Sequence, residues 1–477
     1  RKTTLNALLQ FAGKGGRILA CACPACVEGK PSDGAQALYA VSQKVPFAEN
    51  EILCALEAMR DISVLGESGL RKRDIIYNYR ADGRERWLFL AHCDEPVRTD
   101  GADCRGEKIR VRVKGEYRPE LYDTLGGGVR SVPYKTAGGV TEITLSAYPL
   151  DSFLLRLYPE QGESVPDEAR SFKEKPVKIA DDALYTLSEP NVAVLDLCEW
   201  STDEKEFYPR EEMLRVDKLL RKKYGYPAAD GNDMQPWRIP EEETPLSVYL
   251  RFSFESEIET PCFLAYEYLN EVRLNGKAVT PADEGYFTDE GIRTMRLPLL
   301  KKGRNELIVR VPLSKRISLE NLFLLGDFGV RTEGARWVIG RKREKLFYGS
   351  VTEQGLPFYG AAITYKIPFS CESGDLRVRA DYYNGALVSV KLDGKDVGKI
   401  VLPPYGLTVE NVAAGAHELE LTLYTSRVNS FGALHCCVPV FWKGPSMWYT
   451  QGNEWAYEYQ LHNIGLMKKP VLTLIVR

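Results

Sequence analysis

The fold is decided by a short stretch that occurs twice. Val272-Arg-Leu-Asn-Gly-Lys-Ala-Val279 returns as Val390-Lys-Leu-Asp-Gly-Lys-Asp-Val397. In each copy two short runs flank an Asn-Gly or Asp-Gly pair, and these residues tolerate the positive φ of a tight two-residue turn. Each copy therefore predicts an antiparallel β-hairpin.

Matching elements surround both hairpins. Gly303-Arg-Asn-Glu-Leu-Ile-Val-Arg-Val311 follows the first, and Gly415-Ala-His-Glu-Leu-Glu-Leu-Thr-Leu423 follows the second. Upstream, Leu250-Arg-Phe-Ser-Phe254 corresponds to Tyr365-Lys-Ile-Pro-Phe369. Three elements in one order, repeated at an offset of about 115 residues, indicate an internal duplication. The sequence therefore predicts two tandem β-sandwiches of the jelly-roll type.

The rest of the chain divides by its hydrophobic period. Residues 1–70 alternate helical and strand patterns, with a helix capped by Thr3 or Thr4 and a second helix at 47–59, and so predict an α/β segment. Residues 71–172 alternate with period two and predict an antiparallel β-sandwich.

The two jelly rolls then occupy 173–335 and 336–477, and the first includes a helical linker at 205–240. Within this linker the spacing predicts a helix over 211–224 that turns Leu214, Leu219 and Leu220 inward. The predicted fold is thus multi-domain and mainly β, with an α/β segment at its start.

Composition excludes several classes of protein. The 477 residues carry 63 Lys plus Arg against 66 Asp plus Glu, so no general attraction to nucleic acid or to an anionic membrane is expected. With 44% hydrophobic residues the chain can bury cores, and no apolar run reaches the roughly 18 residues of a spanning helix. Eleven scattered cysteines suit a reducing compartment, which predicts a cytoplasmic location.

The repeated pattern resembles the galactose-binding-like β-sandwiches of family 2 and related glycoside hydrolases. Further motifs make the chain similar to the C-terminal half of large bacterial α-L-rhamnosidases of the family 106 type, over roughly 175 to 460. They are Gly355-Leu-Pro-Phe-Tyr-Gly360, Leu402-Pro-Pro-Tyr405, Asn429-Ser-Phe-Gly-Ala-Leu-His435, Asn191-Val-Ala-Val-Leu-Asp-Leu197 and Gln235-Pro-Trp-Arg238.

This resemblance implies an accessory role. In such enzymes a (β/α)8 barrel carries the catalytic carboxylates, and a barrel needs roughly 250 residues of strand–helix units. No such region is visible, and the chain begins at Arg1 rather than Met, so we expect a catalytic barrel upstream in the same polypeptide. The resemblance also implies that 1–70 is amidotransferase-like, that glycans are the substrate, and that the chain self-associates as a homo-oligomer.

Six side chains in the loops of the second jelly roll are candidates for carbohydrate binding. Aromatic rings stack on the apolar faces of sugars, and planar polar groups bind their hydroxyls. The candidates are Phe358, Tyr359, Tyr405, Asn429, Phe431 and His435. The alternative is that these residues pack the sandwich and join it to neighbouring domains.

Other chemistry is weakly indicated. Cys21-Ala-Cys-Pro-Ala-Cys26 offers three thiols, but a structural zinc site needs four ligands and no second cluster is visible, so no metal or cofactor is expected. Asp196, Glu199 and Asp327 are more simply turn or surface residues than catalytic ones, and no catalytic residue is assigned. A glycan- or protein-binding module without hydrolase activity is therefore the alternative function.

Overall fold

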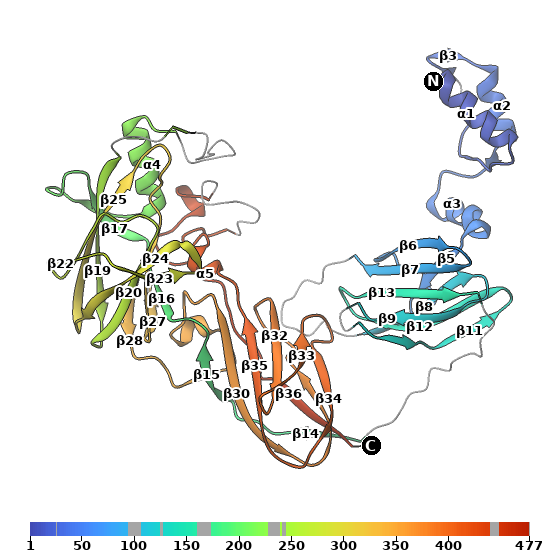
Figure 1. The fold of residues 1–477 in the computed structure, drawn as a ribbon. Coiled ribbons are helices and arrows are strands. Elements are labelled where there is room, and N and C mark those ends of the chain that lie inside the picture. The colour runs from blue at the N-terminus through green and yellow to red at the C-terminus, as the bar shows by residue number, and fades with distance from the viewer. Residues whose placement is uncertain are drawn as a thin grey trace. The chain divides into compact units, whose positions relative to one another are not determined.

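The computed structural model describes residues 1–24, 26–93, 106–124, 127–159, 173–227, 239–240, 245–438 and 448–476. The chain forms two compact units, which Figure 1 draws as ribbons. The first comprises Arg1–Pro96 and Arg105–Ala169, and the second comprises Val97–Cys104 and Arg170–Arg477. Strands predominate over helices, which confirms the prediction of a mainly β protein.

The first unit begins with short helices and two-residue strands. They are α1 (Lys2–Gly13), β1 (Leu19–Ala20), β2 (Cys26–Val27), β3 (Lys30–Pro31), α2 (Asp33–Val41), β4 (Gln43–Lys44), α3 (Glu49–Leu56) and the 3-10 turn η1 (Glu57–Met59). The predicted helices are present, but Thr3 and Thr4 lie inside α1 because Arg1 is its N-cap. No side chain of α1 is buried, so the apolar face of this helix is not a core face.

A two-sheet sandwich follows in the same unit. Its strands are β5 (Ile62–Leu65), β6 (Ile75–Asp82), β7 (Glu85–His92), β8 (Glu107–Lys114), β9 (Arg118–Tyr122), β10 (Val129–Ser131), β11 (Tyr134–Ala137), β12 (Val140–Ala147) and β13 (Ser152–Tyr158). The sheet orders are β10-β9-β13-β7-β6 and β11-β12-β8-β5. Alternate residues such as Ile109, Val111 and Val113 are fully buried, as the period-two pattern predicts.

The second unit contains two further sandwiches. Elements of the first are β16 (Asn191–Leu195), β17 (Leu197–Ser201), β18 (Tyr208–Glu212), α4 (Met213–Tyr224), β19 (Leu246–Ser256), β20 (Thr260–Tyr266), β21 (Glu271–Leu274), β22 (Lys277–Val279), β23 (Asp283–Phe287), β24 (Asp289–Leu300), β25 (Gly303–Leu313), β26 (Leu322–Gly326), β27 (Gly329–Glu333) and β28 (Arg336–Gly340). One sheet runs β16-β26-β20-β24-β23, and the other runs β18-β17-β19-β25-β21-β22, with β27 and β28 attached beside β19.

The second sandwich of this unit combines strands from both ends of the segment 170–477. Its elements are β14 (Lys173–Val177), β15 (Asp182–Leu187), β29 (Lys345–Phe347), η3 (Val351–Gln354), β30 (Ala362–Cys371), β31 (Gly374–Arg379), β32 (Leu387–Leu392), β33 (Lys395–Ile400), β34 (Gly406–Val412), β35 (Gly415–Tyr424), α5 (Val428–Phe431), η5 (Gly452–Glu454) and β36 (Val471–Val476). The sheets run β14-β36-β31-β34 and β29-β15-β30-β35-β32-β33. Strand pairing therefore joins 173–187 to the later sandwich, and it joins β28, which lies beyond the boundary predicted at 336, to the earlier one.

The internal duplication is visible in the sheets. The orders β19-β25-β21-β22 and β30-β35-β32-β33 match element for element, which confirms both predicted hairpins. Asn275 and Asp393 occupy equivalent turn positions with positive φ. Their side chains accept equivalent hydrogen bonds, from the backbone N–H of Glu306 at 3.0 Å and from that of Glu418 at 2.9 Å. The two copies thus share a side-chain contact as well as a backbone path.

Helix α4 packs on the first sandwich of the second unit. The helix is present as predicted and ends at Gly225, which adopts the left-handed conformation. Its inward face is Met213, Val216 and Leu220. The prediction that Leu219 points inward is wrong, because this side chain is 51% exposed. Among the described residues, no helix is both long and apolar enough to cross a membrane.

Candidate functional site

The six predicted carbohydrate-binding residues lie mostly in packed interiors. Phe358 belongs to the core of the first sandwich of the second unit, and Tyr359 and Tyr405 belong to the core of the second. The Asn429 amide binds the backbone of His462 in both directions, at 2.8 and 2.9 Å.

The remaining two predicted residues, Phe431 and His435, are also packed against other side chains. Phe431 packs against Phe287 and Phe323, with ring centroids 5.8 and 5.0 Å away. His435 is buried beside Asp196. The burial of these side chains favours the packing role that the sequence left open.

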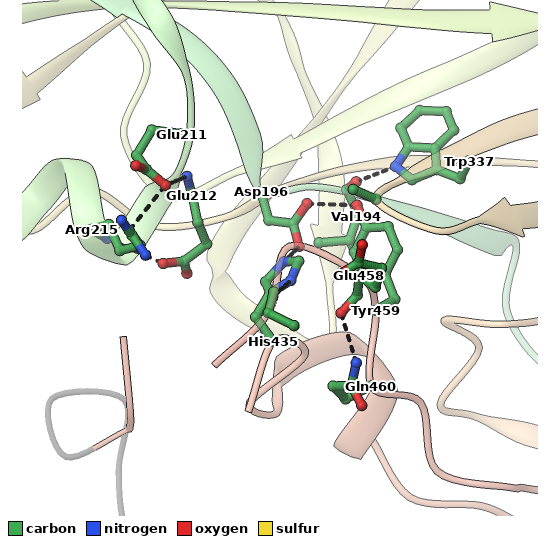
Figure 2. A network of polar contacts seen from close by, with 12 residues as sticks. Val194, Asp196, Glu211, Glu212, Arg215, Trp337, His435, Glu458, Tyr459 and Gln460 are labelled. Carbon is green, nitrogen blue, oxygen red and sulfur yellow. Dashed lines mark hydrogen bonds and ion pairs between the residues drawn. The ribbon is translucent and has the colours of Figure 1, made fainter. Parts of the chain in front are cut away.

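A buried cluster of polar side chains forms around Asp196, at the junction between β16 and β17 (Figure 2). Its carboxylate accepts a hydrogen bond from the Tyr459 hydroxyl at 2.8 Å and lies 3.1 Å from His435 Nε2. Asp196 is 2% exposed, so the expectation that it is a turn or surface residue is wrong. A charge inside the apolar run 192–197 was the sequence signal for this site.

The surroundings of the His435 ring favour its charged form. Nδ1 lies 3.0 Å from the carbonyl oxygen of Ala456, and Nε2 faces the Asp196 carboxylate. A carbonyl oxygen and a carboxylate only accept hydrogen bonds, so a ring that donates to both carries a proton on each nitrogen. Burial alone lowers the pKa of His435, but the hydrogen bond to Asp196 and the charges of Asp196 and Glu212 raise it above its ordinary value.

Glu212 completes the buried part of the cluster. Its side chain accepts a hydrogen bond from the backbone N–H of Arg215 at 3.1 Å and so caps α4. Burial raises the pKa of Glu212 to about 7, and the Asp196 charge adds to this shift while the His435 charge opposes it. A carboxyl group beside a charged pair in the interior is therefore half-protonated near neutral pH.

The protonation of Glu212 predicts a specific pH dependence. Because its folded pKa exceeds its ordinary value of 4.5, folding takes up a proton between these values, and the stabilisation by Glu212 is lost as pH rises towards about 7. Glu212→Gln retains an acceptor for the helix cap. It should remove the contribution of Glu212 to the fall of the unfolding free energy with pH, which is up to about 3 kcal/mol between pH 4.5 and 8. Urea unfolding of both proteins across this range measures it, and parallel stability curves would refute the assignment.

Residues outside the cluster hold the C-terminal segment against α4. Arg215 pairs with Glu211 at 3.0 Å, donates to the carbonyl oxygen of Thr450 at 3.1 Å, and lies 4.1 Å above the Trp455 ring. The Tyr457 hydroxyl donates to Glu211 at 3.1 Å. Figure 2 shows the Arg215–Glu211 pair together with Asp196, Tyr459 and Trp337. Two residues of the cluster, Asp196 and Tyr459, also line a cleft.

Strand β19 has a gap along one edge. Its pairing with β17 covers residues 249–251, and its parallel pairing with β28 covers residues 255 and 256. Between these two neighbours, residues 252–254 have no pairing partner on that edge among the described strands, although they pair with β25 on the other edge. We call the opening at this gap the split-sheet cleft.

The split-sheet cleft encloses about 370 Å³. Its floor contains Trp337, whose indole N–H is fixed by a 2.8 Å hydrogen bond to the carbonyl oxygen of Val194, together with Asp196 and Tyr459. Its charged lining residues are Arg210, Glu255, Arg304, Glu333 and Arg336. No local sequence motif marks these five charged residues.

One group in the first unit has the residue types of a metal site. Ligand atoms of Asp74, His92 and Glu107 lie within 4.8 Å of one another. However, the Lys72 ammonium pairs with Asp74 at 2.9 Å and with Glu107 at 2.6 Å. Burial by itself lowers the pKa of Lys72, yet its bonds to the two carboxylates raise it, so a protein cation already balances their charge. Across the described residues, Cys21, Cys23 and Cys26 do not form such a group.

The comparisons with known proteins gave matches only among solved structures. No family model and no curated protein matches the chain. A rhamnosidase from Novosphingobium sp. PP1Y is 14% identical with a TM-score of 0.44, and the match covers 98% of this chain and 32% of that one. The chain therefore spans about a third of the length of that protein.

Other matches cover half of the chain. A GH2 β-galacturonidase from Eisenbergiella tayi is 11% identical over 49% of this chain and 36% of that one, with a TM-score of 0.21. The exo-chitosanase CsxA from Amycolatopsis orientalis is 12% identical over 50% and 29%, also with a TM-score of 0.21. These solved structures are glycoside hydrolases, but likeness at this level does not show that the chain belongs to their families.

Proposed function

We propose that the second unit is the carbohydrate-binding, accessory part of a glycoside hydrolase of the α-L-rhamnosidase-like type, and that the split-sheet cleft binds the glycan. One observation carries this proposal: an unpaired strand edge opens into a cleft that combines aromatic side chains with arginines and glutamates. Aromatic faces suit the apolar faces of sugar rings, and planar charged groups and free backbone groups suit hydroxyls.

The dimensions of the gap favour a sugar over a peptide. A peptide that adds as a strand needs a continuous edge for its main-chain hydrogen bonds. In the described part of β19 the free edge is limited to residues 252–254, since β17 and β28 occupy the edge on either side. A cleft of a few hundred cubic ångströms is the size of small-molecule sites, which accommodates one or two sugar units.

Several finer assignments belong to the same proposal. The two duplicated sandwiches are jelly rolls of the galactose-binding-like type, and residues 1–70 are the remnant of an amidotransferase-like domain. The catalytic barrel lies elsewhere in the same cytoplasmic polypeptide, and the chain forms a homo-oligomer. The matching strand orders around the two hairpins support the jelly-roll assignment.

A bulky substitution in the cleft tests the proposed function. Ser253 is an exposed residue of β19 at the gap, and Ser253→Trp should fill the cleft and weaken binding of its best oligosaccharide at least about tenfold. Ser370→Trp is the matched control, because Ser370 is an exposed residue of β30, the equivalent strand of the second sandwich. Titration calorimetry of the full chain against neutral and acidic oligosaccharides measures both, after a glycan array selects the ligand.

The outcomes separate clearly. Loss of affinity in Ser253→Trp with retention in Ser370→Trp supports the cleft. Equal affinity in both variants would place the glycan elsewhere, and the absence of binding to any glycan would overturn the proposed function.

A further inference from the structure

The charged residues of the split-sheet cleft are unevenly balanced. Three arginines and two glutamates are in its lining, and Asp196 lies 3.1 Å from Nε2 of His435. Of the glutamates, Glu333 forms an ion pair with Arg331, a residue outside the lining. Positive charge therefore exceeds negative charge where a ligand would enter.

The arginines lie in two places. Arg304 is on β25 directly opposite Glu255 of β19, and it donates to the Ser253 hydroxyl at 3.2 Å. Arg210 donates at 2.7 Å to the carbonyl oxygen of Ala335, the residue before Arg336 at the start of β28, and both arginines line the cleft. Within the described part of the chain, neither Arg210 nor Arg336 has an ion-pair partner, whereas Glu255 has a cation across from it.

The Arg210–Arg336 pair is also close to the aromatic floor. Both Arg336, which is exposed, and Trp337, which is buried and bonded to Val194, line the cleft from β28. Two guanidinium groups without a carboxylate partner among the described residues form a favourable site for a ligand carboxylate, since each can donate two parallel N–H bonds. A sugar ring against the floor would place a ring substituent towards these groups.

We propose that the split-sheet cleft selects an acidic sugar, of the uronic acid class, whose carboxylate is bound by Arg210 and Arg336. This inference rests on the proposed function, because it specifies the ligand of the same cleft. The hydroxyl groups of this sugar would contact Glu255, Arg304 and the unpaired backbone edge of residues 252–254.

The test compares an acid with its uncharged equivalent. The methyl ester of trigalacturonic acid lacks the charge of the carboxyl groups and carries one more methyl group at each, and both compounds are titrated into the full chain by calorimetry. We expect the acid to bind at least about tenfold more tightly than the ester, and its affinity to fall as salt rises from 50 to 500 mM, because screening weakens exposed charge contacts.

Two variants localise the effect. Arg210→Gln and Arg336→Gln should each remove most of the preference for the acid while leaving affinity for the ester within about twofold. Arg296→Gln is the control, because Arg296 lies on β24 in the opposite sheet, where it pairs with Glu284 at 3.4 Å. It should leave the preference unchanged.

The inference and the proposed function fail differently. Equal affinity for acid and ester, or a preference that survives both glutamine variants, overturns the acidic-sugar inference and leaves the cleft as a site for neutral glycans. Failure of the wild-type chain to bind either compound overturns the acidic-sugar inference. Failure to bind any glycan on the array as well overturns the proposed function.

Discussion

Asp196→Asn is expected to destabilise the second unit by about 3–5 kcal/mol, because it leaves the protonated His435 ring buried without its counter-charge. The substitution preserves the shape of the side chain, so the loss reports charge rather than packing. The Asp196–His435 pair is almost completely buried, and the ring is held from its other side by the Ala456 carbonyl oxygen. Urea unfolding followed by tryptophan fluorescence measures the change in the unfolding free energy.

A second His–Asp pair in the chain provides the control. His417 Nδ1 lies 2.8 Å from Asp393, which is closer than in the buried pair, but Asp393 is 47% exposed. Water can replace the lost charge there, so Asp393→Asn should cost less than about 1 kcal/mol. If the two substitutions lower the unfolding free energy equally, burial does not make the Asp196–His435 pair more stabilising than the exposed pair.

Arg221→Met is expected to cost a similar amount, about 3–5 kcal/mol, for a different reason. Arg221 is 1% exposed and pairs with Asp217 at 2.7 Å. Its other nitrogens donate to the carbonyl oxygens of Pro227 and Ile317 and to the Ser318 hydroxyl. Methionine keeps much of the apolar volume but removes the donor from these three acceptors and from Oδ2 of Asp217, whose Oδ1 still accepts a hydrogen bond from the backbone N–H of Leu319.

The matched control for this prediction is the next residue of α4. Lys222 is exposed, so Lys222→Met should change the unfolding free energy by no more than about 0.5 kcal/mol. The same denaturation experiment measures both variants. A loss below about 1 kcal/mol for Arg221→Met would contradict the view that this network fastens α4 to the loop before β26.

Local sequence signals predicted the strands and hairpins well. The Asn275-Gly276 and Asp393-Gly394 pairs need only their own positive φ values to specify a turn, and both hairpins formed as expected. The inward face of α4 was harder to predict. Leu219 and Leu220 both fit an apolar face, and only packing against the sandwich decides which of them is buried.

The site could not be predicted in the same way, because long-range pairing creates it. His435 meets Asp196 across 239 positions of sequence, and the edge of β19 is split by β17 on one side of the gap and by β28 on the other. Aromatic residues near His435 suggested a sugar site, but the sequence could not show that the fold buries them. The arginines of the cleft come from three separate strands and share no motif.

The most direct test of the account is hydrogen–deuterium exchange of the full chain with and without its best-binding oligosaccharide. We predict that the ligand slows exchange in peptides that span 250–256 of β19 and 333–340 of β27 and β28, since these line the split-sheet cleft. Slower exchange confined to 355–360, 402–405 or 429–435, with no change at the cleft, would contradict the account and place the glycan at the motifs that the sequence first indicated.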